Sequence, residues 1–183
     1  MEKKSVIIGE IVDIKTSGIR HHFGVNSTIG YLRLPLDKDL KNIVIENLEI
    51  IVRICVSYTY EPETNNEEVE KVLSIVPVNP EFIELDTIEF SDTRLLLNEE
   101  IKLNTSYKDT YYVFENKDFD VLSFAESYIE ALNSFQEDFI FSYNRLTSIN
   151  NDQLTEHARK IKKLYLNIVS QKEIIHAVKN KTA

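Results

Sequence analysis

The spacing of apolar residues changes along the chain, and this change constrains the fold more than any other feature. Between residues 48 and 56, apolar side chains fall on every second position, which is the period of a half-buried strand. Between residues 123 and 146 they recur at steps of three and four, which is the period of an amphipathic helix. A chain that carries both patterns in separate halves is predicted to be an α+β protein.

The first half reads as a compact β unit. All four glycines lie within the first 30 residues, where they permit tight turns and close approaches of the backbone. The acidic segment EPETNNEEVE reads as an exposed loop. We predict either a small β-barrel or a hairpin unit built from four strands, at residues 5–14, 27–34, 48–56 and 71–78.

Two prolines mark the boundary between the halves. Pro77 and Pro80 lie in the segment VPVNP, and proline interrupts the regular structure on either side of it. We therefore expect a β-rich domain over residues 1–78 and an α+β domain over residues 79–183. Short strands are expected in the second domain at residues 82–90, 101–103 and 109–114.

The second domain is predicted to end in two long helices. Ser123 and Glu126 have the spacing of a capping box at the start of a helix over residues 123–146. A second helix is predicted over residues 152–179, because Leu154, Ile161, Ile168 and Ile175 are spaced by seven. The short break favours an antiparallel helical hairpin, although heptad spacing also allows a partner helix from another chain.

The net charge of −9 is unevenly distributed. Residues 1–57 carry 8 Lys+Arg and 7 Asp+Glu, residues 58–145 carry 6 and 20, and residues 146–183 carry 7 and 3. An acidic middle of this kind repels nucleic acid and attracts basic partners. It is equally what a solvated acidic surface looks like, and the sequence leaves both interpretations open.

No catalytic or metal motif is present in the sequence. There is no Walker loop, no G-x-G-x-x-G, no G-x-S-x-G and no H-E-x-x-H. The single cysteine, Cys55, excludes an internal disulfide framework and a zinc site of several thiolates. We therefore expect a protein without enzymatic activity and without cofactors. No apolar stretch approaches the roughly 20 residues that span a membrane, so we expect no membrane association and a cytoplasmic location.

The stretch TIGYLRLP, followed by the polar segment LDKDLKN and an apolar strand, carries a resemblance to a known family. From residue 28 to 53 this order resembles the swapped-hairpin DNA-binding unit of the AbrB/MazE-like proteins. The resemblance implies a dimer that reads DNA through basic residues of the hairpin. It implies Arg33, Lys38 and Lys41 as DNA contacts, together with Arg20, which lies outside the matched stretch.

Residues 109–139 carry a second resemblance. Short strands lead into SFAESYIEALNSFQEDF, and the segment Ile129–Leu132 with Glu137 is similar to HicB-like antitoxin domains. This resemblance implies an acidic surface that covers a basic partner. The candidate partner-binding residues are Glu126, Glu130, Glu137 and Asp138.

Together these features predict an antitoxin-like transcription regulator that forms a homo-oligomer. Its N-terminal part would bind DNA, and its acidic part would bind a basic protein such as a toxin. The alternative is a protein–protein interaction or scaffold module of a phage, defence or secretion assembly, without DNA binding.

Overall fold

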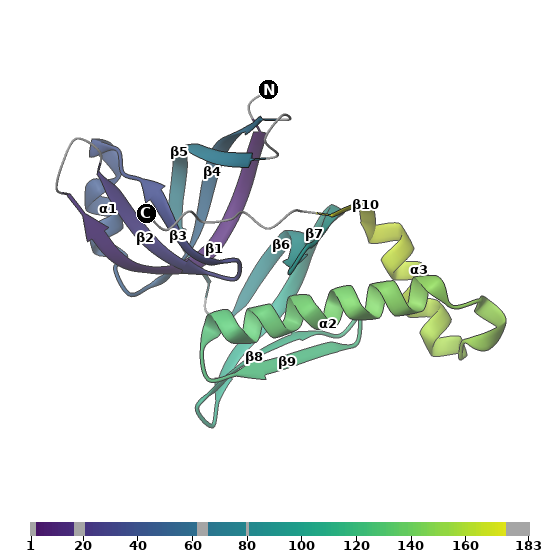
Figure 1. Ribbon diagram of the computed structural model, residues 1–183. Helices are drawn as coiled ribbons and strands as arrows, with labels where there is room; N and C mark the ends of the chain where they lie inside the picture. Colours follow the sequence, from purple (N-terminus) through teal and green to yellow (C-terminus); the bar gives the residue numbers. More distant parts are fainter. Residues whose placement is uncertain (1–2, 17–20, 62–65, 80, 175–183) are drawn as a thin grey trace. The chain divides into compact units, whose positions relative to one another are not determined.

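The computed structural model describes residues 3–16, 21–61, 66–79 and 81–174 (Figure 1). The chain divides into two compact units, with the boundary between Val78 and Asn79. Both units are built on antiparallel five-stranded sheets, and the described residues include three α-helices. The predicted α+β class is therefore confirmed, with strands as the dominant element.

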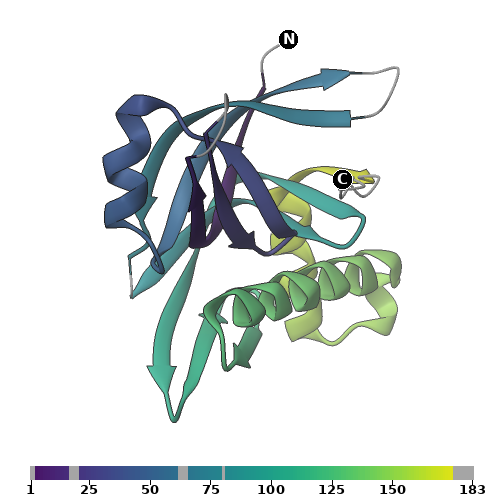
Figure 2. The same cartoon turned by 60° about the vertical axis from the view of Figure 1, so that its left-hand side comes forward.

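The N-terminal unit has five strands and one short helix. In chain order they are β1 (Lys3–Lys15), β2 (His22–Ser27), β3 (Gly30–Pro35), α1 (Lys41–Glu46), β4 (Ile51–Glu61) and β5 (Asn66–Pro77), with a 3-10 turn η1 (Lys38–Leu40) before α1. The sheet order is β3-β2-β1-β4-β5. Its edge strands β3 and β5 approach each other, but the five strands form no closed barrel. Figure 2 shows α1 beside this sheet.

The prediction of a single strand over residues 27–34 was wrong, because a tight turn interrupts this segment. β2 ends at Ser27 and β3 begins at Gly30, whose φ of 104° is in the region that favours glycine. The Ser27 hydroxyl donates a hydrogen bond of 2.8 Å to the Gly30 carbonyl oxygen and closes the turn. β3 then ends at Pro35, which cannot donate to the ladder.

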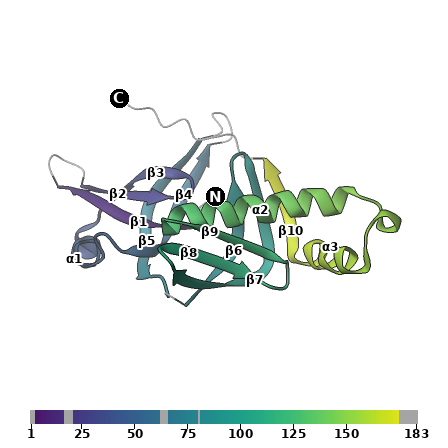
Figure 3. The same ribbon diagram turned by 90° about the horizontal axis from the view of Figure 1, so that it is seen from below.

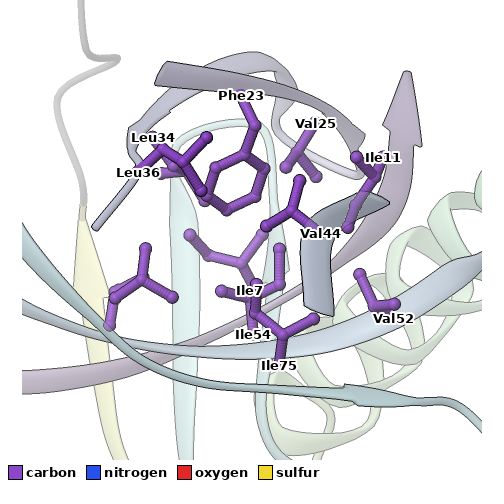
Figure 4. Close-up of a cluster of buried hydrophobic side chains, with 12 residues drawn as sticks. Ile7, Ile11, Phe23, Val25, Leu34, Leu36, Val44, Val52, Ile54 and Ile75 are labelled. Atoms are coloured by element: carbon purple, nitrogen blue, oxygen red, sulfur yellow. The ribbon is translucent and has the colours of Figure 1, made fainter. Parts of the chain in front are cut away.

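The core of the N-terminal unit is supplied by all five strands and by α1. Phe23 of β2 and Val44 of α1 are fully buried, and Figure 4 shows them converging with Ile7 and Ile54. Alternation along β4 places Val52, Ile54 and Val56 in this core, as the two-residue period predicted. The predicted strand began too early, because β4 starts at Ile51 and both Leu48 and Ile50 are exposed.

The second unit contains five strands, two α-helices and a second 3-10 turn. Its elements are β6 (Phe82–Phe90), β7 (Thr93–Lys108), β8 (Tyr111–Asn116), β9 (Val121–Ala125), α2 (Tyr128–Ser148), η2 (Asn151–Gln153), α3 (Glu156–Ile168) and β10 (Val169–Ile174). The order β10-β7-β8-β9 forms the sheet, and β6 also pairs with β7.

Helix α2 packs across one face of this sheet. At one side the Ser123 hydroxyl of β9 donates a hydrogen bond of 2.8 Å to the Ala131 carbonyl oxygen. At the other side the Glu89 backbone N–H of β6 donates one of 2.8 Å to the buried side chain of Gln136. Figure 3 shows α2 running alongside β8 and β9.

The predicted start of the first long helix was wrong by about one turn. Residues 121–125 form strand β9 instead, and Phe124 is exposed there. The helix is capped by Ser127, whose side chain accepts a hydrogen bond from the Glu130 backbone N–H at 3.2 Å. Ser127 and Glu130 have the same S-x-x-E spacing as the pair that was predicted to cap the helix.

The predicted second helix over residues 152–179 was also wrong in its length. Helix α3 ends at Ile168, and the chain continues as β10, which pairs with β7. Ile161 and Ile168 are buried, but Leu164 is exposed, and Ile175 lies outside the described residues. The heptad positions therefore do not continue as one long helix in the described chain, and α3 packs on α2 through the ring of Tyr165 against Phe139.

Candidate nucleic-acid interface

The outer face of β1, β2 and β3 brings together polar and aromatic side chains from three strands. The register places Asp13 of β1 opposite Gly24 of β2, and Gly24 opposite Arg33 of β3. Leu34 and Phe23 point into the core, so the alternate positions Tyr31 and Arg33 face outward. We call the surface formed by Asp13, Gly24, Tyr31 and Arg33 the Tyr31 face.

The side chain of Tyr31 lies across the backbone of Gly24. A Cβ atom built on Gly24 would be 2.4 Å from the Tyr31 hydroxyl oxygen and 2.9 Å from Cγ of Asp13. Only glycine leaves room for this arrangement. An aromatic residue that covers a strand glycine in this way also shields the ladder beneath it.

A hydrogen bond fixes the end of the tyrosine side chain. The Tyr31 hydroxyl donates to Oδ2 of Asp13 at 2.8 Å. This hydrogen bond to the carboxylate, assisted by partial burial, raises the pKa of Tyr31, while the nearby Arg33 acts in the opposite direction. The side chain is 41% exposed, so the fixed phenol ring remains accessible beside a guanidinium group.

The predicted DNA contacts are not all brought together. Arg33 belongs to the Tyr31 face and is exposed. Lys38 and Lys41 are also exposed, but they lie beyond Pro35, in η1 and at the start of α1. Arg20 lies outside the described residues.

The predicted partner-binding residues are exposed but do not share one surface. Glu130 and Glu137 are two turns apart on α2 and point the same way, together with the exposed Phe141. Asp138 points about 100° away from Glu137. Burial raises the pKa of Tyr165, and the nearby charge of Asp138 adds to this effect. Glu126 lies in the connection between β9 and α2.

Sequence reasoning missed Tyr31, Gly24 and Asp13 as members of one site. A signal was present: within the alternation of residues 30–35, Tyr31 and Arg33 occupy the outward positions. The missing information was the register of β2 against β3, which places the tyrosine diagonally across a glycine.

Two kinds of feature are absent from the described residues. They contain no group of three or more His, Cys, Asp or Glu side chains that could hold a metal ion. No helix among them is both long enough and apolar enough to cross a membrane.

Comparison with known proteins identifies no relative: no protein-family model, no curated protein and no solved structure matches the chain.

Proposed function

We propose that this protein is a non-enzymatic nucleic-acid-binding protein whose N-terminal unit holds a nucleic acid on the Tyr31 face. The observation that carries this proposal is the Tyr31 ring, held over Gly24 by Asp13, with Arg33 beside it. Aromatic rings stack on nucleic-acid bases, and guanidinium groups pair with phosphates.

The topology of the N-terminal unit supports this proposal. A five-stranded sheet in the order β3-β2-β1-β4-β5, with a helix between β3 and β4, resembles an OB-fold in its strand order. That fold is a partly open barrel, which binds oligonucleotides and oligosaccharides mainly on its second and third strands. This likeness is an analogy at the level of the fold, and its two binding strands correspond to β2 and β3, which carry Gly24, Tyr31 and Arg33 of the Tyr31 face.

Charge favours a single strand over a duplex as the ligand. Residues 1–78 carry 9 Lys+Arg and 12 Asp+Glu, a net charge of −3. Binding must therefore depend more on stacking, worth about 1–3 kcal/mol per base, than on neutralised phosphates. If Arg33 and one further cation contact phosphates, the logarithm of the association constant should fall by only about 1.4 for each tenfold increase in salt concentration.

The test is a fluorescence-anisotropy titration of the full chain with a labelled single-stranded 15-mer and with a duplex of the same sequence. Tyr31→Ala should weaken single-strand binding by about 5- to 100-fold, because a stacked ring is lost. Arg33→Ala should weaken it and reduce the salt dependence. Tyr107→Ala, which removes an exposed tyrosine of the second unit, is the matched control. Undetectable binding at low salt, or unchanged binding by Tyr31→Ala, would refute the proposal.

The second part of the proposal assigns a basic protein partner to the C-terminal unit. The carboxylates of Glu130 and Glu137 precede Phe141 on one face of α2, and Phe141 is 61% exposed. Such complementary charge speeds the encounter with a basic protein. With nucleic-acid binding in the other unit, this is the layout of an antitoxin-like regulator.

A scaffold module is the alternative, and two measurements distinguish it. The regulator should bind nucleic acid and behave as a homo-oligomer in sedimentation experiments. A scaffold should show neither property unless its assembly partners are present.

A further inference from the structure

Strand β9 forms a free edge of the second sheet. It pairs with β8 through five residue pairs, from Tyr112↔Ala125 to Asn116↔Val121. The sheet order ends at β9, and no other described strand pairs with it. The backbone N–H and C=O groups along its outer side are therefore available to another chain.

The side chains beside this edge are apolar and exposed. Leu122 is 58% exposed and Phe124 is 63% exposed, whereas Ser123 between them points to α2 and is buried. Phe124 lies against Tyr111 of β8 in an edge-to-face contact, with ring centroids 5.9 Å apart. Val113, directly opposite Phe124, completes the surface that we call the β9 edge surface: Tyr111, Val113, Leu122 and Phe124.

The segments that carry and flank the β9 edge surface are rich in acidic residues. Residues 109–130 contain six Asp+Glu and one Lys, a net charge of −5. Asp120 and Glu126 lie directly before and after β9, and both are exposed. Oδ2 of Asp120 also lies 3.4 Å from Nε2 of the exposed His157. An apolar strip with carboxylates at both ends matches a basic and apolar segment in charge and in polarity.

We infer that the β9 edge binds an extended segment of a basic protein as an added strand. Backbone hydrogen bonds to β9 would hold this segment, its alternate apolar side chains would contact Leu122 and Phe124, and Lys or Arg near its ends would pair with Asp120 and Glu126. The inference rests on the proposed protein-binding role of the C-terminal unit, and it adds where and how the partner binds.

The same charges disfavour two other occupants. In an antiparallel pair of two β9 strands centred on Ser123, Asp120 of one copy would lie opposite Glu126 of the other. Like charges directly opposite each other destabilise a strand pair. A nucleic acid would stack on Tyr111 and Phe124, but its phosphates would meet the net charge of −5.

The test uses the full chain and a labelled seven-residue peptide that alternates apolar and polar residues with lysine at both ends (KVTVTVK). The peptide should protect the amides of residues 121–125 from hydrogen exchange. It should bind at least tenfold more tightly than EVTVTVE, in which glutamates replace the lysines. Absence of protection at residues 121–125 would overturn the inference.

Variants locate the binding surface. Leu122→Thr with Phe124→Thr should weaken the peptide at least tenfold. The matched control is Leu166→Thr with Ile174→Thr, which alters similarly exposed apolar residues on α3 and β10 and should bind normally. Thermal unfolding of each variant checks that it is folded.

If affinity instead falls only in the double variant Glu130→Lys with Glu137→Lys, the peptide binds α2. The proposed role of the C-terminal unit then stands, and the β9 inference fails. Self-association that Phe124→Thr abolishes, or oligonucleotide protection of residues 121–125, would also overturn it.

Discussion

At the scale of single residues, Gly24 determines how Tyr31 is presented. Gly24→Ala would place a Cβ atom where the Tyr31 hydroxyl and the Asp13 carboxyl now lie, so the tyrosine must swing away and lose its hydrogen bond. We expect a loss of about 1 kcal/mol in the free energy of unfolding and a fall of the Tyr31 pKa towards its ordinary value. NMR titration of labelled tyrosines measures the pKa.

Gly30→Ala is the control for this substitution. The φ of 104° at Gly30 strains any side chain, but nothing lies within 4 Å of its Cβ position. Stability should therefore fall by about 1 kcal/mol or more while the Tyr31 pKa stays raised. If Gly24→Ala leaves the pKa raised as well, the close approach does not control Tyr31.

Tyr128 gives a prediction about alkaline pH. It is buried against Tyr112 and Phe114, and its hydroxyl has no hydrogen-bond partner among the described residues. Burial raises its pKa, so above about pH 10 the unfolded chain loses this proton while the folded chain keeps it. Stability should fall as pH rises through this range. Tyr128→Phe should reduce that loss and cost nothing at pH 7, as chemical denaturation at both pH values can show. If Tyr128→Phe instead lowers the free energy of unfolding at pH 7, the Tyr128 hydroxyl has a hydrogen-bond partner in the folded chain.

At the scale of elements, the start of α2 depends on Ser127. Its side chain accepts the Glu130 backbone N–H, and losing such a cap costs about 1 kcal/mol. Ser127→Ala should therefore lower the free energy of unfolding by about this amount in urea denaturation. Ser134→Ala, within the same helix, should have no effect or a slightly stabilising one. Equal losses in both variants would contradict the capping role.

The sequence could predict that this helix exists but not where it begins. Ser123 with Glu126 and Ser127 with Glu130 both have capping-box spacing, and they are four residues apart. The helical period therefore fits either start. Pairing of residues 121–125 with β8 decides between them, and a long-range pairing of this kind leaves no local signal.

The end of α3 was hidden for the same reason. The seven-residue spacing continues beyond Ile168 in the sequence, but residues 169–174 pair with β7, about 75 positions earlier. The strand at residues 82–90 was predictable because its signal is local, and it coincides with β6. At the Tyr31 face, similarly, Arg33 could be singled out from the sequence, but its neighbours depend on register.

At the scale of the whole molecule, the two units differ in what they can bind. Residues 1–78 have a net charge of −3, and residues 79–174, with 10 Lys+Arg and 18 Asp+Glu, have one of −8. A nucleic acid is therefore repelled more strongly by the second unit, and a basic protein is attracted more strongly to it. This division of charge supports separate sites for the two proposed ligands.

Each unit has a hydrophobic core of its own, and this predicts how the full chain loses its structure. Phe23 and Phe114 are fully buried, one in each unit, and replacing a buried phenylalanine by alanine costs about 3–5 kcal/mol. Because native hydrogen exchange reports the opening of cooperative units, Phe23→Ala should speed exchange in β1–β5 and leave β6–β10 protected. Phe114→Ala should do the reverse. If either variant lowers protection equally throughout the chain, the units unfold as one, and the binding sites proposed for them would have to be treated as energetically coupled.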